Sequence, residues 1–332
     1  MKPAKIQKIG RFFRAVLALA AFAMVFPLAA CMYVGGSAGD EEAPLRVTFL
    51  DVGQGLAVLL EKDGHYAMYD MGPDSVGVMD SLRSRGVDTL EWVLISHNHR
   101  DHAGGFLELG RGPSKPARVH VKRLFVGPDT LGGFVRDSVL KVARRFGIAV
   151  DTVVRGTSLG LGEGASDGLS QVGDAPRFEV LWPPDYMRLG GNAASVVLDV
   201  GYGEGHALLT GDLDSACERR LLELSPTLTA GLLQVPHHGS AGSSSLAFVS
   251  RVAPEFAVAS VGEKNPYGHP AGQVVRKYAV VLGDSTRFFR TDRDGSVAFS
   301  LYRGMGVMRY PAKPIRALKW HCVWSSAFIP KI

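Results

Sequence analysis

Residues 95–105 read ISHNHRDHAGG and place three histidines and one aspartate within six consecutive positions. They follow the apolar run 92–95, WVLI, which is typical of a buried strand. Side chains along a strand repeat with a period of two, so His97 and His99 are expected to face the same volume. Asp101 and His102 follow in the turn and are expected to project toward it. Imidazole nitrogens and carboxylate oxygens bind Zn²⁺, iron or Mn²⁺, so the pattern predicts a metal site rather than a polar loop with scattered histidines.

The N-terminal thirty residues differ in composition from the rest, because five basic residues precede the apolar run 15–26 and no acidic residue occurs before Asp40. This pattern predicts a secretory signal peptide over residues 1–30. Residues 28–31, LAAC, resemble the lipobox of bacterial lipoproteins, in which the cysteine becomes the lipidated N-terminus. We therefore expect an extracytoplasmic protein of the cell envelope, anchored to a membrane by lipid on Cys31, with residues 31–44 as a tether. The alternative is an N-terminal anchor helix that extends through Val34.

Net charge gives no support for a dedicated nucleic-acid binder. The chain has 37 basic and 32 acidic residues, a formal charge of +5, but five of the basic residues lie in the leader. A basic C-terminal tail, residues 311–332, holds four more basic residues and no acid. The body between them is therefore acidic overall, whereas nucleic-acid binders usually show a basic face. Nucleic acid is expected only as a substrate, and the sequence indicates no protein partner.

Cysteine usage indicates a fold without structural disulfides. Only three cysteines occur, and none lies in a CxxC or Cys/His finger pattern. If Cys31 is lipidated, Cys217 and Cys322 are the only remaining pair. Cys217 falls in a predicted helix over residues 215–224, so we expect it to be a buried free thiol.

Short apolar runs and helical patterns alternate from residue 45 to residue 310, which we interpret as one domain. The segment 155–175 is rich in glycine and serine and predicts a surface loop. Strands are predicted at 45–52, 56–61, 65–70, 92–96, 119–126, 148–154, 178–182, 195–200, 206–210, 232–235, 256–261, 288–290 and 297–301. Helices are predicted at 76–84, 131–146, 215–224 and 271–282, with one more between 240 and 256.

Acidic and histidine side chains recur directly after apolar strands, at Asp70, Asp212 and the pair His237 and His238 as well as in the first cluster. Loops at one edge of a sheet core converge, so these groups can share one cleft. Asp212 can bridge two cations or cap the helix after it, and Asp70 can orient a ligand or cap its own following helix. The predicted ligands are His97, His99, Asp101, His102, Asp212 and one of His237 and His238.

The spacing H-x-H-x-D-H over residues 97–102 resembles the metallo-β-lactamase superfamily. Four further segments, in the same order, resemble the hydrolase domain of the DNA-uptake channel protein ComEC: DVGQG at 51–55, LTGD at 209–212, PHHGS at 236–240 and YGHP at 267–270. The resemblance covers about residues 45–305. It implies an α+β fold, the αββα sandwich, in which two mixed β-sheets pack together with helices on the outer faces and metals at their exposed edge. We find no counterpart of the ComEC channel, so DNA transport is not carried over.

The resemblance also implies two divalent metal ions, with Zn²⁺ favoured and Mn²⁺ as the alternative. His97 and His99 would hold the first ion, while Asp101, His102 and His238 would hold the second, and Asp212 would bridge them. His238 is preferred to His237, although the two are close to equivalent by sequence. Asp101, His237 and His269 are expected to act in catalysis; the alternative for His269 is a turn histidine that only packs.

One departure from the wider superfamily concerns the first metal. Many members have a further histidine ligand between the cluster and the bridging aspartate, but here that interval holds only His120, in a predicted strand, and His206, beside a hairpin. In ComEC-like domains the position resembles Asn192, so a weak oxygen ligand or none is expected there. A looser first site makes Mn²⁺ plausible beside Zn²⁺.

Three classes of function remain open from the sequence. The favoured class is a lipid-anchored phosphodiesterase that acts on nucleic acid or on envelope phosphodiesters through a water activated by two metals. The second class hydrolyses a non-phosphate ester, a lactone or a β-lactam, and the third is a non-catalytic envelope protein that binds metal. A phosphate substrate predicts basic side chains at the rim, with Arg100 and Lys264 as candidates, whereas a lactam or lactone predicts an apolar rim.

Overall fold

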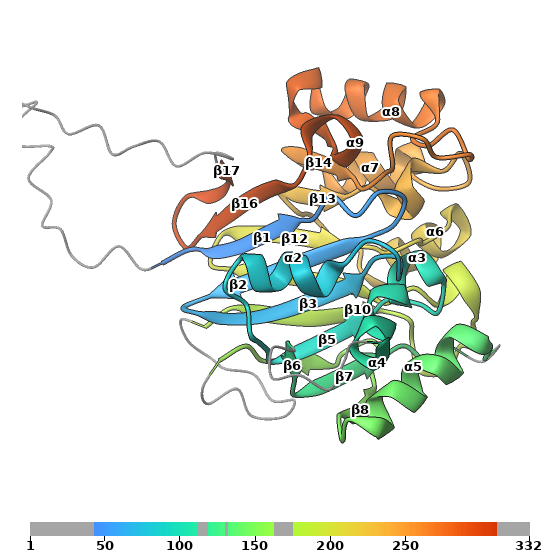
Figure 1. Ribbon diagram of the computed structural model, residues 1–332. Helices are drawn as coiled ribbons and strands as arrows, with labels where there is room; N and C mark the ends of the chain where they lie inside the picture. The colour runs from blue at the N-terminus through green and yellow to red at the C-terminus, as the bar shows by residue number, and fades with distance from the viewer. Residues whose placement is uncertain (1–42, 112–118, 130–131, 163–174, 311–332) are drawn as a thin grey trace, which may run out of the picture. The chain divides into compact units, whose positions relative to one another are not determined.

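The computed structural model describes residues 43–111, 119–129, 132–162 and 175–310, and two large β-sheets form its centre (Figure 1). The strands of the first sheet are β1 (Leu45–Phe49), β2 (Ala57–Lys62), β3 (His65–Met71), β5 (Trp92–Ile95), β7 (Arg123–Val126), β8 (Ala149–Thr152), β16 (Val297–Tyr302) and β17 (Gly306–Tyr310). Their order is β17-β16-β1-β2-β3-β5-β7-β8. The sheet is mixed, because β3, β5, β7 and β8 are parallel while the other pairs are antiparallel.

The second sheet is mixed in the same way. Its strands are β9 (Ser158–Leu159), β10 (Arg177–Trp182), β11 (Val197–Tyr202), β12 (Gly205–Leu209), β13 (Leu232–Gln234), β14 (Phe256–Ala259) and β15 (Phe288–Arg290). They lie in the order β15-β14-β13-β12-β11-β10-β9, antiparallel from β9 to β12 and parallel from β12 to β15.

Strand β2 shows why the sequence forms layers. Successive side chains of a strand point to opposite faces. Val58 and Leu60 of β2 therefore pack into the cluster between the sheets, where they join Leu198 and Val200 of β11. Leu59 faces the other way and packs into the cluster beneath the helices. Because both faces of the strand are apolar and buried, β2 must be covered by a sheet on one side and by helices on the other.

Helices cover the outer face of each sheet, which confirms the predicted αββα sandwich (Figure 1). The first sheet is covered by α2 (Val78–Ser84), α3 (Arg100–Ala103), α4 (Glu108–Arg111) and α5 (Phe134–Arg145). The second is covered by α6 (Ser215–Leu224), α7 (Leu246–Val252) and α8 (Gly272–Leu282). The remaining short helices are η1 (Gly104–Leu107), η2 (Gly191–Ala194), η3 (Pro236–Gly239), η4 (Ser285–Arg287) and α9 (Thr291–Asp294).

Several predicted boundaries were wrong. The strand predicted over 119–126 is two strands, since β6 (His120–Val121) pairs with β4 (Thr89–Leu90) in a small separate sheet before the chain enters β7. The first strand ends at Phe49 instead of residue 52, because the residues after it form a turn at the site. Strand β17 was not predicted, yet it pairs with β16 along its whole length.

The predicted signal peptide, Cys31, nearly all of the tether and the basic tail 311–332 lie outside the described residues. Within the described ranges, no helix is both long enough and apolar enough to cross a membrane. Cys217 is a buried free thiol in α6, as predicted.

The buried carboxylate of Glu218, in α6, holds the segment that leads into α7, whose N-cap is Ser245. Its oxygens accept hydrogen bonds from the backbone N–H groups of Ser244 at 2.5 Å and Ser245 at 2.8 Å. Burial raises the pKa of Glu218, which offsets part of the gain from these bonds. We expect Glu218→Ala to lower the free energy of unfolding by about 2 kcal/mol, because two buried N–H groups lose their acceptor.

Urea unfolding at neutral pH measures this effect. The control is Glu223→Ala, which removes an exposed carboxylate of the same helix that pairs with Arg220 and is expected to cost less than about 0.5 kcal/mol. Equal losses in the two variants would show that Glu218 does not support the segment before α7.

Candidate metal centre

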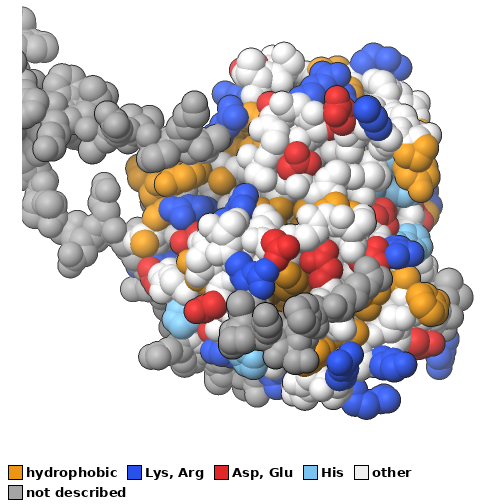
Figure 2. All heavy atoms as spheres, in the orientation of Figure 1, with side chains coloured by type: hydrophobic (Ala, Val, Ile, Leu, Met, Phe, Trp, Pro, Cys, Tyr) orange, Lys and Arg blue, Asp and Glu red, His pale blue; other side chains and the backbone are white. Residues whose placement is uncertain are grey.

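Loops from both sheets meet at one end of the sandwich. The chain leaves β5 into the segment that holds His97 and His99, and α3 begins directly after it with Asp101 and His102. Asp212 lies just beyond β12 of the other sheet. Histidine side chains (pale blue) reach the surface at the right-hand edge of the face drawn in Figure 2, at the end where α3 and α6 lie in Figure 1.

All six predicted ligands come together in two groups that share Asp212. In each group the ligand atoms lie within 4.8 Å of one another. The groups are Asp101, His102, Asp212 and His238, and His97, His99 and Asp212.

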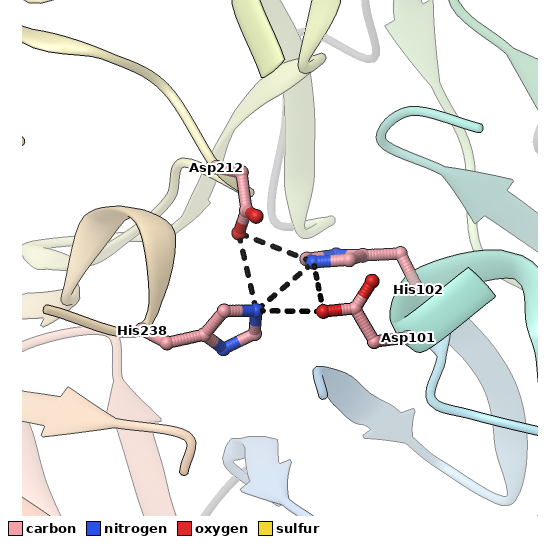
Figure 3. Close-up of side chains that lie close together, drawn as sticks. All are labelled: Asp101, His102, Asp212 and His238. Carbon is pink, nitrogen blue, oxygen red and sulfur yellow. Dashed lines mark hydrogen bonds and ion pairs between the residues drawn. The ribbon is translucent and has the colours of Figure 1, made fainter. Parts of the chain in front are cut away.

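The first of these groups is compact, and its four side chains converge on one point (Figure 3). His102 Nε2 lies 3.1 Å from Asp212 Oδ1 and 3.2 Å from His238 Nε2. His238 Nε2 lies 3.3 Å from Asp101 Oδ2 and 3.4 Å from Asp212 Oδ1. Two imidazole nitrogens and two carboxylates therefore face each other at distances that a single cation could span.

The two histidines of this group are oriented from behind. His102 Nδ1 lies 2.7 Å from Asp70 Oδ2, and His238 Nδ1 lies 2.7 Å from the carbonyl oxygen of Ser260. Each Nδ1–H donates to that oxygen, so the lone pair of Nε2 points into the group, as a metal ligand requires. Two facing lone pairs beside two carboxylates repel one another unless a proton or a cation lies between them. The residues present therefore fit a divalent metal ion.

Asp70 orients a ligand and does not cap a helix. Its oxygens also accept hydrogen bonds from the N–H and hydroxyl of Ser96, both at 2.7 Å. The start of helix α2 is capped instead by Glu108, whose carboxylate oxygens accept hydrogen bonds from the N–H groups of Gly77 at 3.0 Å and Met79 at 3.2 Å. Asp212 does not cap α6 either, because that role belongs to Asp214, which accepts a hydrogen bond from the N–H of Cys217 at 2.9 Å. Both carboxylates are thus committed to the centre.

The second group is looser. His97 is buried, and its Nε2 has no hydrogen-bond partner among the described residues. Asp212 Oδ2 lies 3.9 Å from this nitrogen. An imidazole nitrogen without a partner in a buried position is costly, and a bound cation would satisfy it. His99 lies on the exposed side, with its ring centroid 4.5 Å from that of His97.

Asn192 lies beside this group, where the sequence predicted a weak ligand or none. Its Nδ2 lies 3.2–3.3 Å from the ring nitrogens of His237, and its Oδ1 is buried without a partner. The other two histidines of the interval are elsewhere: His120 is exposed on β6, and His206 lies 3.3 Å from Asp199. Neither histidine of that interval thus reaches the group, while the amide oxygen of Asn192 lies beside it.

Burial and charge act in opposite directions across the centre. Burial lowers the pKa of His97 well below its ordinary value, and the nearby His102 adds to the effect. For His102 burial also favours the neutral form, but the charges of Asp212 and Asp70 outweigh it and raise the pKa well above its usual range. Burial alone would raise the pKa of Asp212, yet His102 and His238 hold it well below its usual range. The Asp212 side chain is therefore an anion between the two groups.

The centre opens into a pocket of about 410 Å³. His237 and His269 lie in its wall with ring centroids 5.9 Å apart, and Tyr267 stacks on His269. Of the two predicted rim cations, Arg100 lines the pocket and forms a bidentate pair with Asp74, whereas the exposed Lys264 is not among the lining residues. The full lining is Gln54, Asn98, His99, Arg100, Asp101, Val135, Asn192, Asp212, His237, His238, Tyr267 and His269.

Segment 51–55, DVGQG, holds the metal loop in place. The N–H of Leu56 donates to the carbonyl of Asp101 at 3.0 Å, and a Cβ on Gly55 would lie 2.4 Å from that same oxygen. Only glycine permits so close an approach of two backbones. Gln54 reaches across and accepts from the N–H of Gly262 at 3.2 Å. The close approach explains why position 55 is a glycine.

The sequence profile of the metallo-beta-lactamase superfamily matches residues 50–263. The chain belongs to this superfamily. It is 31% identical over 269 residues to competence protein ComA of Neisseria gonorrhoeae, a match that covers 79% of this chain and 33% of that protein. It is 29% identical over 231 residues to ComE operon protein 3 of Bacillus subtilis, a match that covers 69% of this chain and 27% of that protein. The predicted likeness to competence proteins is confirmed.

The chain spans about a third of the length of these curated relatives. Among solved structures, CmlA, a diiron beta-hydroxylase from Streptomyces venezuelae, superposes with a TM-score of 0.49 at 13% identity, over 78% of this chain and 54% of that one. Membership of the superfamily makes the chain a metal-dependent hydrolase by class, with the two groups above as its candidate metal-binding residues.

Proposed function

We propose that this protein is a phosphodiesterase that uses two divalent metal ions. The polarity of the pocket is the observation that carries the proposal. Among the described residues that line it, Val135 is the only aliphatic one, and the rest are histidines, carboxylates, amides, a tyrosine and Arg100. A lactam or lactone site would need an apolar rim, whereas an anionic phosphodiester is favoured by hydrogen-bond donors and cations.

The roles of the residues follow from their places. His97, His99 and Asp212 would hold one ion, and Asp101, His102, His238 and Asp212 the other. Bound there, two such ions would lower the pKa of a water molecule and offset negative charge on a phosphodiester.

The other polar side chains would act on the substrate or on its neighbours. His237, in the wall beside Asp212, would donate an N–H to a non-bridging phosphate oxygen. His269 lies next to it, with the ring centroids 5.9 Å apart, and would give a proton to the leaving oxygen. Asn192 orients the His237 ring through its amide. Asp101 serves as ligand and accepts the proton of the attacking water.

The setting of the activity is proposed from the N-terminal pattern and from the relatives. The lipobox-like LAAC run supports attachment through Cys31 and action outside the cytoplasm, and the named relatives are competence proteins. Nucleic acid and envelope phosphodiesters are the two substrate groups that this location allows. Zn²⁺ suits the histidine-rich ligand set, while the sparse first group also suits Mn²⁺.

The test uses the chain from Met32 onward, stripped with a chelator and reloaded with Zn²⁺ or Mn²⁺. We expect about two ions per chain by elemental analysis, and turnover of bis-p-nitrophenyl phosphate that exceeds turnover of p-nitrophenyl acetate and nitrocefin under the same conditions. Removal of the ions should abolish turnover. Two bound ions with faster ester or lactam hydrolysis would replace this proposal by the second class, and absence of bound ions would exclude both.

A further inference from the structure

A single buried amide, Gln234 at the end of β13, lies between the two loops that carry Asp212 and His238, and it is 1% exposed. Its Oε1 accepts from the N–H of Thr210 at 2.7 Å and from the Thr210 hydroxyl at 2.9 Å, whose proton is shared with the backbone carbonyl of Gln234 at 3.0 Å. Its Nε2 donates to the carbonyl of Gly211 at 3.1 Å and to that of Val235 at 2.8 Å. A glutamine side chain offers two acceptor positions and two N–H donors, so every one of them is used.

These four bonds join the backbones of both loops. Thr210 and Gly211 directly precede Asp212, while Val235 directly precedes the segment PHHGS. The carbonyl of Gly211 also accepts from the N–H of His237 at 3.0 Å, which adds a second link at the same point. Sheet pairing does not supply this connection, because the pairing of β12 with β13 ends at Leu208 and Leu233. Gln234 continues the connection where the ladder stops.

The histidine loop needs support of this kind. His237 and His238 have φ values of 51° and 54°, in the left-handed region that residues with a Cβ rarely adopt. Such a conformation persists only where the surroundings hold it. The Val235 carbonyl, one residue before Pro236, is fixed by Gln234, so the loop enters this conformation from a defined starting point.

We propose that Gln234 is a positioning residue that sets the spacing between Asp212 and His238 and thereby forms the metal site that needs both. Asp212 Oδ1 and His238 Nε2 lie 3.4 Å apart across the junction that Gln234 bonds. Of the two loops that Gln234 joins, the group with His97 and His99 includes only the one that carries Asp212. We therefore expect that group to depend less on Gln234. This inference rests on the proposed function only in that the two groups bind metal; it requires no particular substrate.

Metal titration of the whole mature chain tests the proposal, with Zn²⁺ alone followed by calorimetry and Co²⁺ alone followed by its visible absorption. Gln234→Met keeps the length of the side chain and removes all four bonds. One of the two bound metal ions should be lost in His238→Ala. We expect the affinity for that same ion to fall by about 10–100-fold in Gln234→Met. The Co²⁺ spectrum of that site should change, and the other equivalent should bind within about threefold of the parent.

Two further variants keep the test decisive. Gln234→Glu retains the acceptor for Thr210 but turns a carboxylate oxygen toward the carbonyls of Gly211 and Val235, so it should show the same loss if Gln234→Met does not fold. Val200→Ala removes buried apolar volume from β11 without touching either loop. It should lower the melting temperature and leave both affinities and the Co²⁺ spectrum unchanged.

The proposal is overturned if both Gln234 variants bind two ions as tightly as the parent with an unchanged spectrum. It is equally overturned if Val200→Ala weakens metal binding as much as they do, because Gln234 would then act through stability alone. Neither result depends on phosphodiester turnover, so failure of the proposed substrate class would be seen separately.

Discussion

Replacing Asp212 by asparagine is expected to lower phosphodiester turnover by at least about 10³-fold, roughly 4 kcal/mol in the activation barrier. Asp212 is the only side chain common to both candidate groups. An amide of the same shape carries no charge and can bridge two cations only poorly. We also expect fewer than two ions per chain at metal concentrations that saturate the parent. Elemental analysis and kcat with bis-p-nitrophenyl phosphate measure the two effects.

The matched control is Asp199→Asn. Asp199 is also a buried carboxylate on the second sheet, but it pairs with Arg177 at 2.8 Å and with His206 at 3.3 Å, away from the centre. The same chemical change there should leave metal content and kcat close to those of the parent. If Asp212→Asn kept two ions and most of its turnover, Asp212 would not be the bridge and the two-metal mechanism would be wrong.

The αββα sandwich was predicted from the motifs that the chain shares with the superfamily, whereas most of its strands could be located from their apolar runs alone. The strand β5, WVLI, is followed at once by the histidine cluster, and this arrangement alone places a metal loop at a sheet edge. Weaker signals failed. Strand β17, GVMRY, has few apolar residues and only Val307 is buried, so local pattern could not reveal it. Strands β6 and β7 were predicted as one strand, because the chain passes from the small sheet to the large one without a change in the pattern of apolar residues.

The candidate ligands could be predicted for a different reason: four of them are histidines, of which the chain has only ten, and all six lie in segments that directly follow an apolar strand. What could not be predicted is the support behind them. The carbonyl of Ser260, which fixes the ring of His238, is a backbone group. Every residue carries such a carbonyl, so the sequence cannot single out this one. Gln234 reads simply as the end of an apolar strand, and its four bonds follow from the approach of loops that are set by tertiary packing.

The choice between His237 and His238 required the structure, because adjacent residues have the same spacing to every other motif. Side-chain exposure separates them, at 26% for His237 and 3% for His238. His238 Nε2 joins the compact group, whereas His237 Nε2 lies 3.6 Å from the other oxygen of Asp212 and faces the pocket. We therefore propose His238 as the ligand and His237 as the donor to substrate.

This assignment predicts opposite results for two neighbouring alanine substitutions. His238→Ala should lose one of the two ions and, with it, at least about 10³-fold in kcat. His237→Ala should keep both ions and lose about 10²–10³-fold in kcat, as expected for a missing donor to transition-state charge. Both positions have φ near +50°, so alanine meets the same backbone strain at either one. Metal analysis beside kcat separates the two roles, and loss of an ion in His237→Ala but not in His238→Ala would reverse the assignment.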